Sequence, residues 1–144
     1  MTEPQHDDRL IFLIGQARQR LYTRLDQALL DQAGVTTAQA GALFFLSQND
    51  GCLLLELSRV MADLSSITRM AGRLEKKTLV ERRPCPGDGR AVRVYLTPAG
   101  RKTAKGCLAT VRAHNEAIKD GFSDSDIKNF SRILQTVIQR FREE

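Results

Sequence analysis

The stretch from residue 80 to residue 100 constrains the fold of this chain more than any other segment. Two runs rich in β-branched and aromatic residues, Val80–Arg83 and Ala91–Leu96, favour extended strands. Proline and glycine interrupt the chain between these runs, at Pro84, Pro86, Gly87 and Gly89. These residues mark tight turns, so the stretch predicts a β-hairpin. Thr97 is a suitable N-cap, and Pro98 a suitable first residue, for a helix that follows the hairpin at once.

The hairpin is also basic, because it holds Arg82, Arg83, Arg90 and Arg93 against only Glu81 and Asp88. The net charge of the chain is +5, and residues 52–105 hold 12 Lys or Arg against 5 Asp or Glu, a local balance of +7. The rest of the chain holds 10 bases and 12 acids, a balance of −2. Basic charge concentrated in one segment favours a polyanionic partner. A solvated basic surface is the alternative.

Helical periodicity and capping residues place the remaining elements. Apolar residues recur at helical spacing from about Asp7 to Asp31, and Gly34 ends this helix. Thr36 or Thr37 caps a second helix, which reaches about Gln48. Further helices are expected over 54–61, 65–77 and 98–120, with a turn over 49–51 and a break over 62–64. Ser123 and Asp126 form a capping box for a final helix, which is expected to continue almost to the last residue.

The helix over residues 65–77 has two distinct faces. Its apolar face consists of Ile67, Met70, Ala71 and Leu74. This face is expected to pack on the preceding helix, at Leu54, Leu57 and Val60. Its opposite face carries arginine and short hydrogen-bonding side chains: Ser65, Thr68, Arg69 and Gly72, flanked by Ser66 and Arg73. Such a face fits the major groove of DNA, where arginine grips guanine. Asp63 is the expected N-cap. An ordinary amphipathic helix is the alternative.

The hairpin after this helix completes the pattern of a winged helix-turn-helix. Arg90 stands at its tip, and we expect it to enter the minor groove, where A·T-rich stretches concentrate negative potential. Asp88 is expected to hold the guanidinium of Arg90 in a fixed geometry. The alternative is a surface ion pair worth less than about 1 kcal/mol. The predicted DNA-binding residues are therefore Ser65, Ser66, Thr68, Arg69 and Arg73 in the helix and Arg83, Asp88 and Arg90 in the wing.

The predicted fold class is mainly α with a small β-wing (α+β): a winged helix-turn-helix with long N- and C-terminal dimerisation helices. We expect a single domain over 1–144, with a DNA-binding lobe over 35–97 and a helical dimerisation region over 7–31 and 98–142. The apolar stripe from Ile127 to Phe141 needs a partner to cover it, and a second copy of the chain is the simplest one. A homodimer is therefore predicted, with packing of the first helix on the last within one chain as the alternative.

Other classes of function find little support in the sequence. His6 and His114 are the only histidines, and neither a Gly-rich phosphate loop nor a nucleophile elbow is present, so we expect no enzyme. The histidines and scattered acids have no metal-ligand spacing, so no metal is expected. No apolar run is long enough to span a membrane, and the N-terminus is polar, so the expected location is the cytoplasm.

The chain has three cysteines, Cys52, Cys85 and Cys107, without the spacing of a disulfide framework or a zinc site. Cys107 is expected to be buried. Cys85 is expected to lie exposed on the hairpin near Arg82 and Arg83, whose positive charges would favour a reactive thiolate. A thiol-based redox-sensing regulator is therefore an alternative function, and a basic DNA-architectural protein is a weaker one.

The sequence resembles the MarR family of winged-helix transcription regulators over nearly its whole length. The matching segments are Ser65–Arg69, Arg73–Lys77, Leu79–Pro84, Asp88 with Arg90, and Leu96–Gly100. The resemblance implies a homodimer joined by its terminal helices, with recognition helices in the major grooves and wings in the minor grooves of a pseudo-palindromic operator. It also implies repression of transcription, and in many members release from DNA by a small aromatic or phenolic effector bound between the lobes.

Three residues depart from the pattern of that family. Leu64 stands where the family often has a basic or polar residue, and Met61 replaces a common glycine. Thr78 also stands where the family usually has glycine. If the chain turns left-handed at Thr78, the β-branched side chain costs about 1 kcal/mol or more, and a different end to the helix is the alternative.

Overall fold

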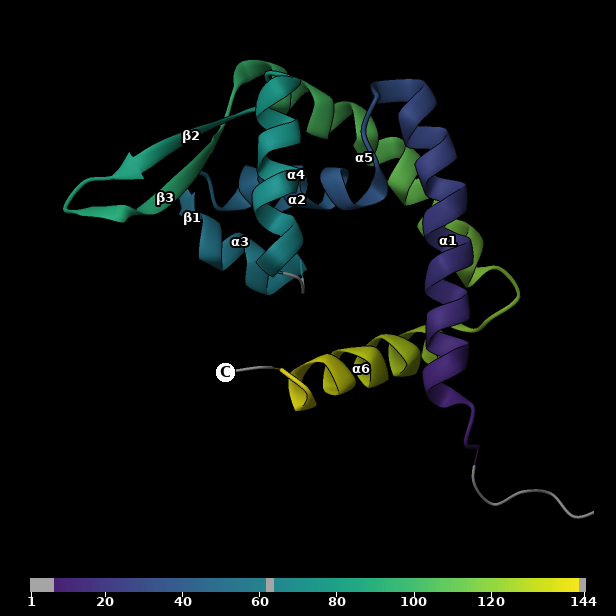
Figure 1. The fold of residues 1–144 in the computed structure, drawn as a ribbon. Coiled ribbons are helices and arrows are strands. Elements are labelled where there is room, and N and C mark those ends of the chain that lie inside the picture. The colour runs from purple at the N-terminus through teal and green to yellow at the C-terminus, as the bar shows by residue number, and fades with distance from the viewer. Residues whose placement is uncertain (1–6, 62–63, 143–144) are drawn as a thin grey trace, which may run out of the picture. The chain divides into compact units, whose positions relative to one another are not determined.

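The computed structural model describes residues 7–61 and 64–142 of the chain, and it is mainly helical with one small sheet (Figure 1). Its elements are, in chain order, α1 Leu10–Ala33, α2 Thr37–Gln48, β1 Cys52–Leu53, α3 Leu54–Met61, α4 Leu64–Lys76, β2 Val80–Cys85, β3 Asp88–Leu96, α5 Pro98–Lys119 and α6 Asp124–Arg140. The expected fold class, mainly α with a β-wing, is therefore confirmed. The chain divides into two units, one ending at Thr110 and the other beginning at Val111, so α5 contributes to both.

Local capping explains where the first two helices end and begin. Gly34 adopts a left-handed conformation with φ of 69°, and its N–H donates to the carbonyl of Leu30 at 3.1 Å. This glycine ends α1 as predicted, although the helix continues to Ala33. Thr36 is the N-cap of α2, because its hydroxyl accepts from the N–H of Gln39 while the Gln39 side chain accepts from the N–H of Thr36. This reciprocal capping box settles the choice between Thr36 and Thr37.

The sheet is antiparallel and three-stranded, in the order β1-β3-β2. The hairpin strands are longer than the sequence predicts, and they pair from Val80 with Leu96 to Cys85 with Asp88. The pairing is irregular between Pro84 and Cys85, on an edge strand where a residue without an N–H is tolerated. The third strand, β1, was not expected. It has two residues, and it exists because Cys52 pairs with Val94 of the hairpin.

The core of the first unit is built from α2, α3 and α4, the sheet, the end of α1 and the buried face of α5. Ile67, Ala71 and Leu74 of α4 are buried together with Leu57 of α3, as predicted. Val60 is not part of this core, because its side chain is 54% exposed. Met61 instead points inward, with its terminal methyl carbon 3.6 Å from the place where a Cβ at Gly41 would lie. Met61 lies one full turn after Leu57, so it shares the buried face better than Val60 does.

Thr78 does turn left-handed, with φ of 61°. The N–H of Thr78 donates to the carbonyl of Glu75 at 2.9 Å, and the N–H of Leu79 donates to the carbonyl of Leu74 at 3.0 Å. These bonds end α4 in the way that a glycine normally does. The Thr97 hydroxyl donates to the carbonyl of Thr78 at 2.6 Å and so holds this strained residue against the start of α5. The helix therefore ends in the usual way, at a cost in backbone strain.

We expect Thr78→Gly to raise the free energy of unfolding by about 1 kcal/mol, because glycine adopts this conformation without a Cβ clash. Thr78→Ala keeps a Cβ but removes the branch, so it should gain less. Urea denaturation of both variants at one protein concentration measures the effect. A Thr78→Gly protein no more stable than the parent would show that the left-handed conformation is not costly here.

The second unit holds the end of α5 and the whole of α6. Ser123 is the N-cap of α6, and its hydroxyl accepts from the N–H of Asp126 at 3.0 Å, as the predicted capping box requires. None of the residues of α6 is buried. Large apolar side chains stand exposed along this unit: Phe122, Phe130, Ile133, Ile138 and Phe141. The first half of α1 is similar, with Leu10, Ile11, Phe12, Leu13 and Ile14 exposed.

Candidate nucleic-acid interface

The outer face of α4 presents the side chains that the sequence assigned to DNA reading. Thr68, Arg69 and Arg73 are exposed, and Ser66 is half-buried. The helix is fixed from behind by its buried apolar face, so the outer row has a defined direction. Ser65 lies in the first turn of α4, and its side chain lies outside the described residues, as does the predicted N-cap Asp63.

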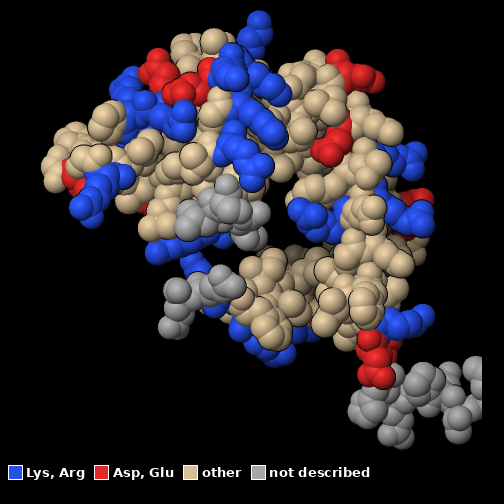
Figure 2. All heavy atoms as spheres, viewed as in Figure 1, with Lys and Arg blue, Asp and Glu red and all other residues tan. Residues whose placement is uncertain are grey.

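Basic side chains continue from α4 onto the hairpin. Figure 2 shows Lys and Arg along α4 and on the β2–β3 hairpin, with a small group of acids among them. The exposed bases of this surface are Arg69, Arg73, Lys76, Lys77, Arg83 and Arg90. Two of them, Lys77 and Arg83, also bond to other residues of the fold. The Lys77 ammonium donates to the carbonyl of Gly34 at 2.6 Å and to the Gln39 side chain at 3.0 Å, which ties the end of α4 to the turn between α1 and α2.

Arg83 is held on the face of the hairpin by two partners. Its guanidinium donates to the Glu81 carboxylate at 2.7 Å and lies 4.5 Å from the centre of the Tyr95 ring. The hydrogen bond to Glu81 raises the pKa of Arg83, which therefore stays positively charged. The side chain is still 59% exposed, so it remains available to a phosphate.

The wing tip corrects one prediction. Arg90 is exposed at the tip, as expected, but the Asp88 carboxylate accepts from the backbone N–H of Arg90 at 3.0 Å rather than from its guanidinium. The backbone N–H two residues ahead is the donor that a short aspartate side chain reaches most easily in a turn. Asp88 therefore orders the backbone of the tip, and within the described part of the hairpin no ion pair joins it to Arg90.

The base of the wing is anchored by residues that sequence reasoning missed. Asp50 accepts from the N–H of Leu96 at 2.8 Å and from the Arg101 guanidinium at 2.6 Å, so it joins the turn after α2 to both β3 and α5. Arg93 donates to the carbonyl of Gly51 at 2.8 Å. The sequence signalled only a turn at residues 49–51, because the partners of Asp50 and Gly51 lie more than forty residues further along the chain.

Comparison with known proteins assigns this arrangement to a family. The sequence profile of the MarR family matches residues 35–92, which span the lobe from the start of α2 into β3. The multiple antibiotic resistance protein MarR of Escherichia coli is 32% identical over 133 residues, which cover 90% of this chain and 89% of that protein. The chain belongs to the MarR family.

Two further relatives bear on the interface. The HTH-type transcriptional repressor IacR of Pseudomonas putida is 26% identical over 117 residues, covering 81% of this chain and 70% of that protein. The structure of a mutant Escherichia coli MarR complexed with operator DNA matches with a TM-score of 0.73 and 26% identity, covering 92% of this chain and 99% of that one. These relatives are transcriptional regulators, which are not enzymes.

The cysteines of this MarR-family chain have different surroundings. Cys52 and Cys107 are buried, and burial raises the pKa of both thiols, which disfavours their reactive thiolate forms. Cys85 is half-buried in the hairpin. Its thiol donates to the carbonyl of Pro86 at 3.7 Å, and its interaction with Arg93 raises the pKa of that arginine. The predicted neighbours Arg82 and Arg83 each pair with an acid.

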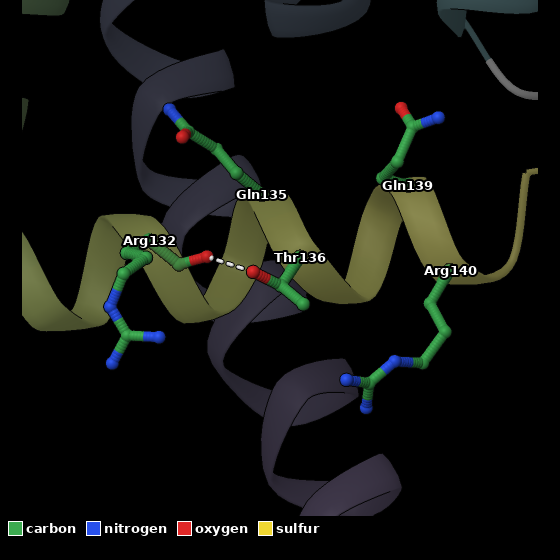
Figure 3. Close-up of a pocket in the computed structure, with 5 residues that line it drawn as sticks. All are labelled: Arg132, Gln135, Thr136, Gln139 and Arg140. Carbon is green, nitrogen blue, oxygen red and sulfur yellow. Dashed lines mark hydrogen bonds between the residues drawn. The ribbon is translucent and has the colours of Figure 1, made fainter.

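Other kinds of site gain no support from the described residues. No group of three or more His, Cys, Asp or Glu within them is arranged to hold a metal ion. No helix among them is long and apolar enough to cross a membrane. A polar hollow runs along α6, but its five lining side chains come from one helix and do not converge, since Arg132 and Arg140 point to one side and Gln135 and Gln139 to the other (Figure 3).

Proposed function

We propose that this MarR-family protein is a cytoplasmic, sequence-specific DNA-binding repressor of transcription. The observation that carries the proposal is the exposed row of Thr68, Arg69 and Arg73 on a helix fixed to the core, beside a basic hairpin. The width of α4 fits the major groove of duplex DNA. Two relatives support this function: the repressor IacR, and the MarR protein that was solved on its operator.

The proposed contacts with DNA differ according to the chemistry of each side chain. Arg69 grips a guanine or a phosphate from the centre of α4, and Ser65, Ser66 and Thr68 hydrogen-bond to bases or phosphates. Arg73 and Arg83 neutralise phosphates beside the helix and the hairpin. Arg90 enters the minor groove from the wing tip, whose backbone Asp88 orders.

The proposed binding unit is a homodimer on a pseudo-palindromic operator. The exposed apolar side chains of α1 and of α6 support this, since such surfaces on both terminal helices are wide for a monomer. Two-fold symmetry pairs two reading helices with two half-sites, as a pseudo-palindrome requires.

Release from DNA is proposed to follow binding of a small aromatic or phenolic effector, as in many members of this family. A thiol-responsive release is the second candidate. The observation that favours it is the position of Cys85, which lies on the hairpin and is half-buried, whereas Cys52 and Cys107 are buried.

Arg69→Ala is expected to weaken operator binding by about 1 to 3 kcal/mol. The operator is first obtained by selection from a pool of random duplexes with the parent protein, and binding is then measured by fluorescence anisotropy. Arg20→Ala is the matched control, because it also removes an exposed arginine, from the middle of α1 and outside the lobe. Parent binding should also fall steeply as salt rises, since several phosphates lose counterions.

A parent protein that enriches no duplex from the pool would contradict the proposed function. Equal affinity of the parent and Arg69→Ala at matched salt would show instead that α4 does not read the DNA.

A further inference from the structure

Glu75, in the last full turn of α4, is bonded twice to one residue of the wing. One carboxylate oxygen accepts from the Arg82 guanidinium at 2.9 Å, and the other accepts from the Arg82 backbone N–H at 3.2 Å. These hydrogen bonds lower the pKa of Glu75, so its carboxyl is ionised at neutral pH. The two residues stand on either side of the left-handed turn at Thr78, so the contact closes the corner between α4 and β2.

Arg82 is directed back along α4 and away from the outer surface of the wing. A methyl group built at Gly72 would lie 3.9 Å from Nη2 of Arg82, one turn of helix before Glu75. The side chain of Arg82 is 32% exposed, against 59% for its neighbour Arg83. β2 is an edge strand, and the Arg82 N–H points away from β3 to the carboxylate on α4. The helix thus holds the edge of the wing through both backbone and side chain.

We propose that Glu75 and Arg82 are positioning residues that set the direction of the wing relative to the reading helix, and that Arg82 does not itself contact phosphate. This inference rests on the proposed function. It deepens that function, because the wing reaches the minor groove only when its angle to α4 matches the spacing of the two grooves.

Removal of Glu75 is expected to change operator affinity in the direction opposite to the one that simple electrostatics predicts. Removing an acid from a DNA-facing surface ought to tighten binding, because it removes a repulsion with phosphate. If Glu75 positions the wing, its removal weakens binding instead. Glu81→Met is the matched control, because Glu81 is an acid of the same hairpin whose loss frees Arg83 for phosphate.

The test compares Glu75→Met, Arg82→Met, the double variant and Glu81→Met with the parent. Glu75→Met should weaken binding to the selected operator about fivefold, and the double variant should bind no worse than either single variant, because the pair acts as one unit. Arg82→Met should leave the salt slope unchanged, whereas loss of a phosphate contact lowers it by about 1. Glu81→Met should bind as tightly as the parent or more tightly.

Hydrogen exchange on the DNA-free proteins gives a second readout. In Glu75→Met, the Arg82 amide and its neighbours in β2 should exchange faster, while the buried amides of α4 keep the rates of the parent. Unchanged exchange at Arg82, additive losses in the double variant, or tighter binding by Glu75→Met would overturn the proposal. If the parent selects no duplex, the proposed function fails, and the exchange measurement still decides whether Glu75 holds the wing.

Discussion

Gly100→Ala is expected to lower the free energy of unfolding by about 3 kcal/mol or more. Overpacking a buried site typically costs about 1 to 3 kcal/mol, and a clash with backbone atoms costs at least as much as the upper end of this range. Gly100 is buried in the first turn of α5. A Cβ at this position would lie 2.0 Å from the carbonyl oxygen of Leu79 and 3.0 Å from the Leu96 side chain. The Leu79 carbonyl cannot move away easily, because it accepts the N–H of Thr97 at 3.1 Å. The close approach of α5 to the corner between α4 and β2 therefore requires glycine.

Gly106→Ala on the same helix is the control. It is exposed, and a Cβ there would have no neighbour within 4 Å, so alanine should raise the free energy of unfolding by about 0.5 to 1 kcal/mol. Urea denaturation at one fixed protein concentration measures both variants, since dimerisation makes stability depend on concentration. Losses of similar size in the two variants would mean that α5 does not pack on Leu79 as closely as the structure shows.

Features fixed by neighbouring residues could be predicted from the sequence. Gly34, the N-cap Thr36 and the Ser123–Asp126 box end or begin helices through bonds that span only a few residues. Gly34 and the Ser123–Asp126 box are found where expected, and Thr36 is one of the two N-caps that the sequence offered. The β2–β3 hairpin is likewise local, since its strands are joined by a short turn. In the helix caps both partners of each bond lie within one turn of chain, and in the hairpin the paired strands follow one another directly along the chain.

Features that depend on distant pairing could not be predicted. A two-residue strand such as β1 carries no periodic signal, and it is recognised only once Cys52 meets Val94. The sequence marks Asp50 only as a turn residue, and its bond to the Arg101 guanidinium is found only in the folded chain. At the wing tip Arg90 is exposed as expected, but the predicted bond of Asp88 to its guanidinium is not found, because the backbone N–H of Arg90 was also within reach of Asp88. The roles of these residues on DNA remain predictions.

Full-length protein is expected to sediment as a dimer at micromolar concentration, and a chain truncated after Gly121 is expected to aggregate or unfold. The truncation removes α6, whose apolar side chains include Phe130, Ile133 and Ile138, between 49% and 70% exposed in the single chain. Exposed apolar faces of this extent on α6 and on α1 are costly in water, and a second copy can bury both at once. Circular dichroism and sedimentation velocity together distinguish unfolding from simple dissociation.

Ile138→Asp tests the same interface without removing a helix. Burying one isoleucine contributes about 1.5 to 3 kcal/mol, and a two-fold interface counts it twice, so the dimer should weaken by about 3 to 6 kcal/mol, at least a hundredfold in Kd. Gln139→Asp is the control, because it places the same charge on an exposed polar position next to it. If the full-length parent is a stable monomer at micromolar concentration, or if both variants dimerise as it does, α6 is not the dimer contact and the pairing of two reading helices on one operator loses its structural basis.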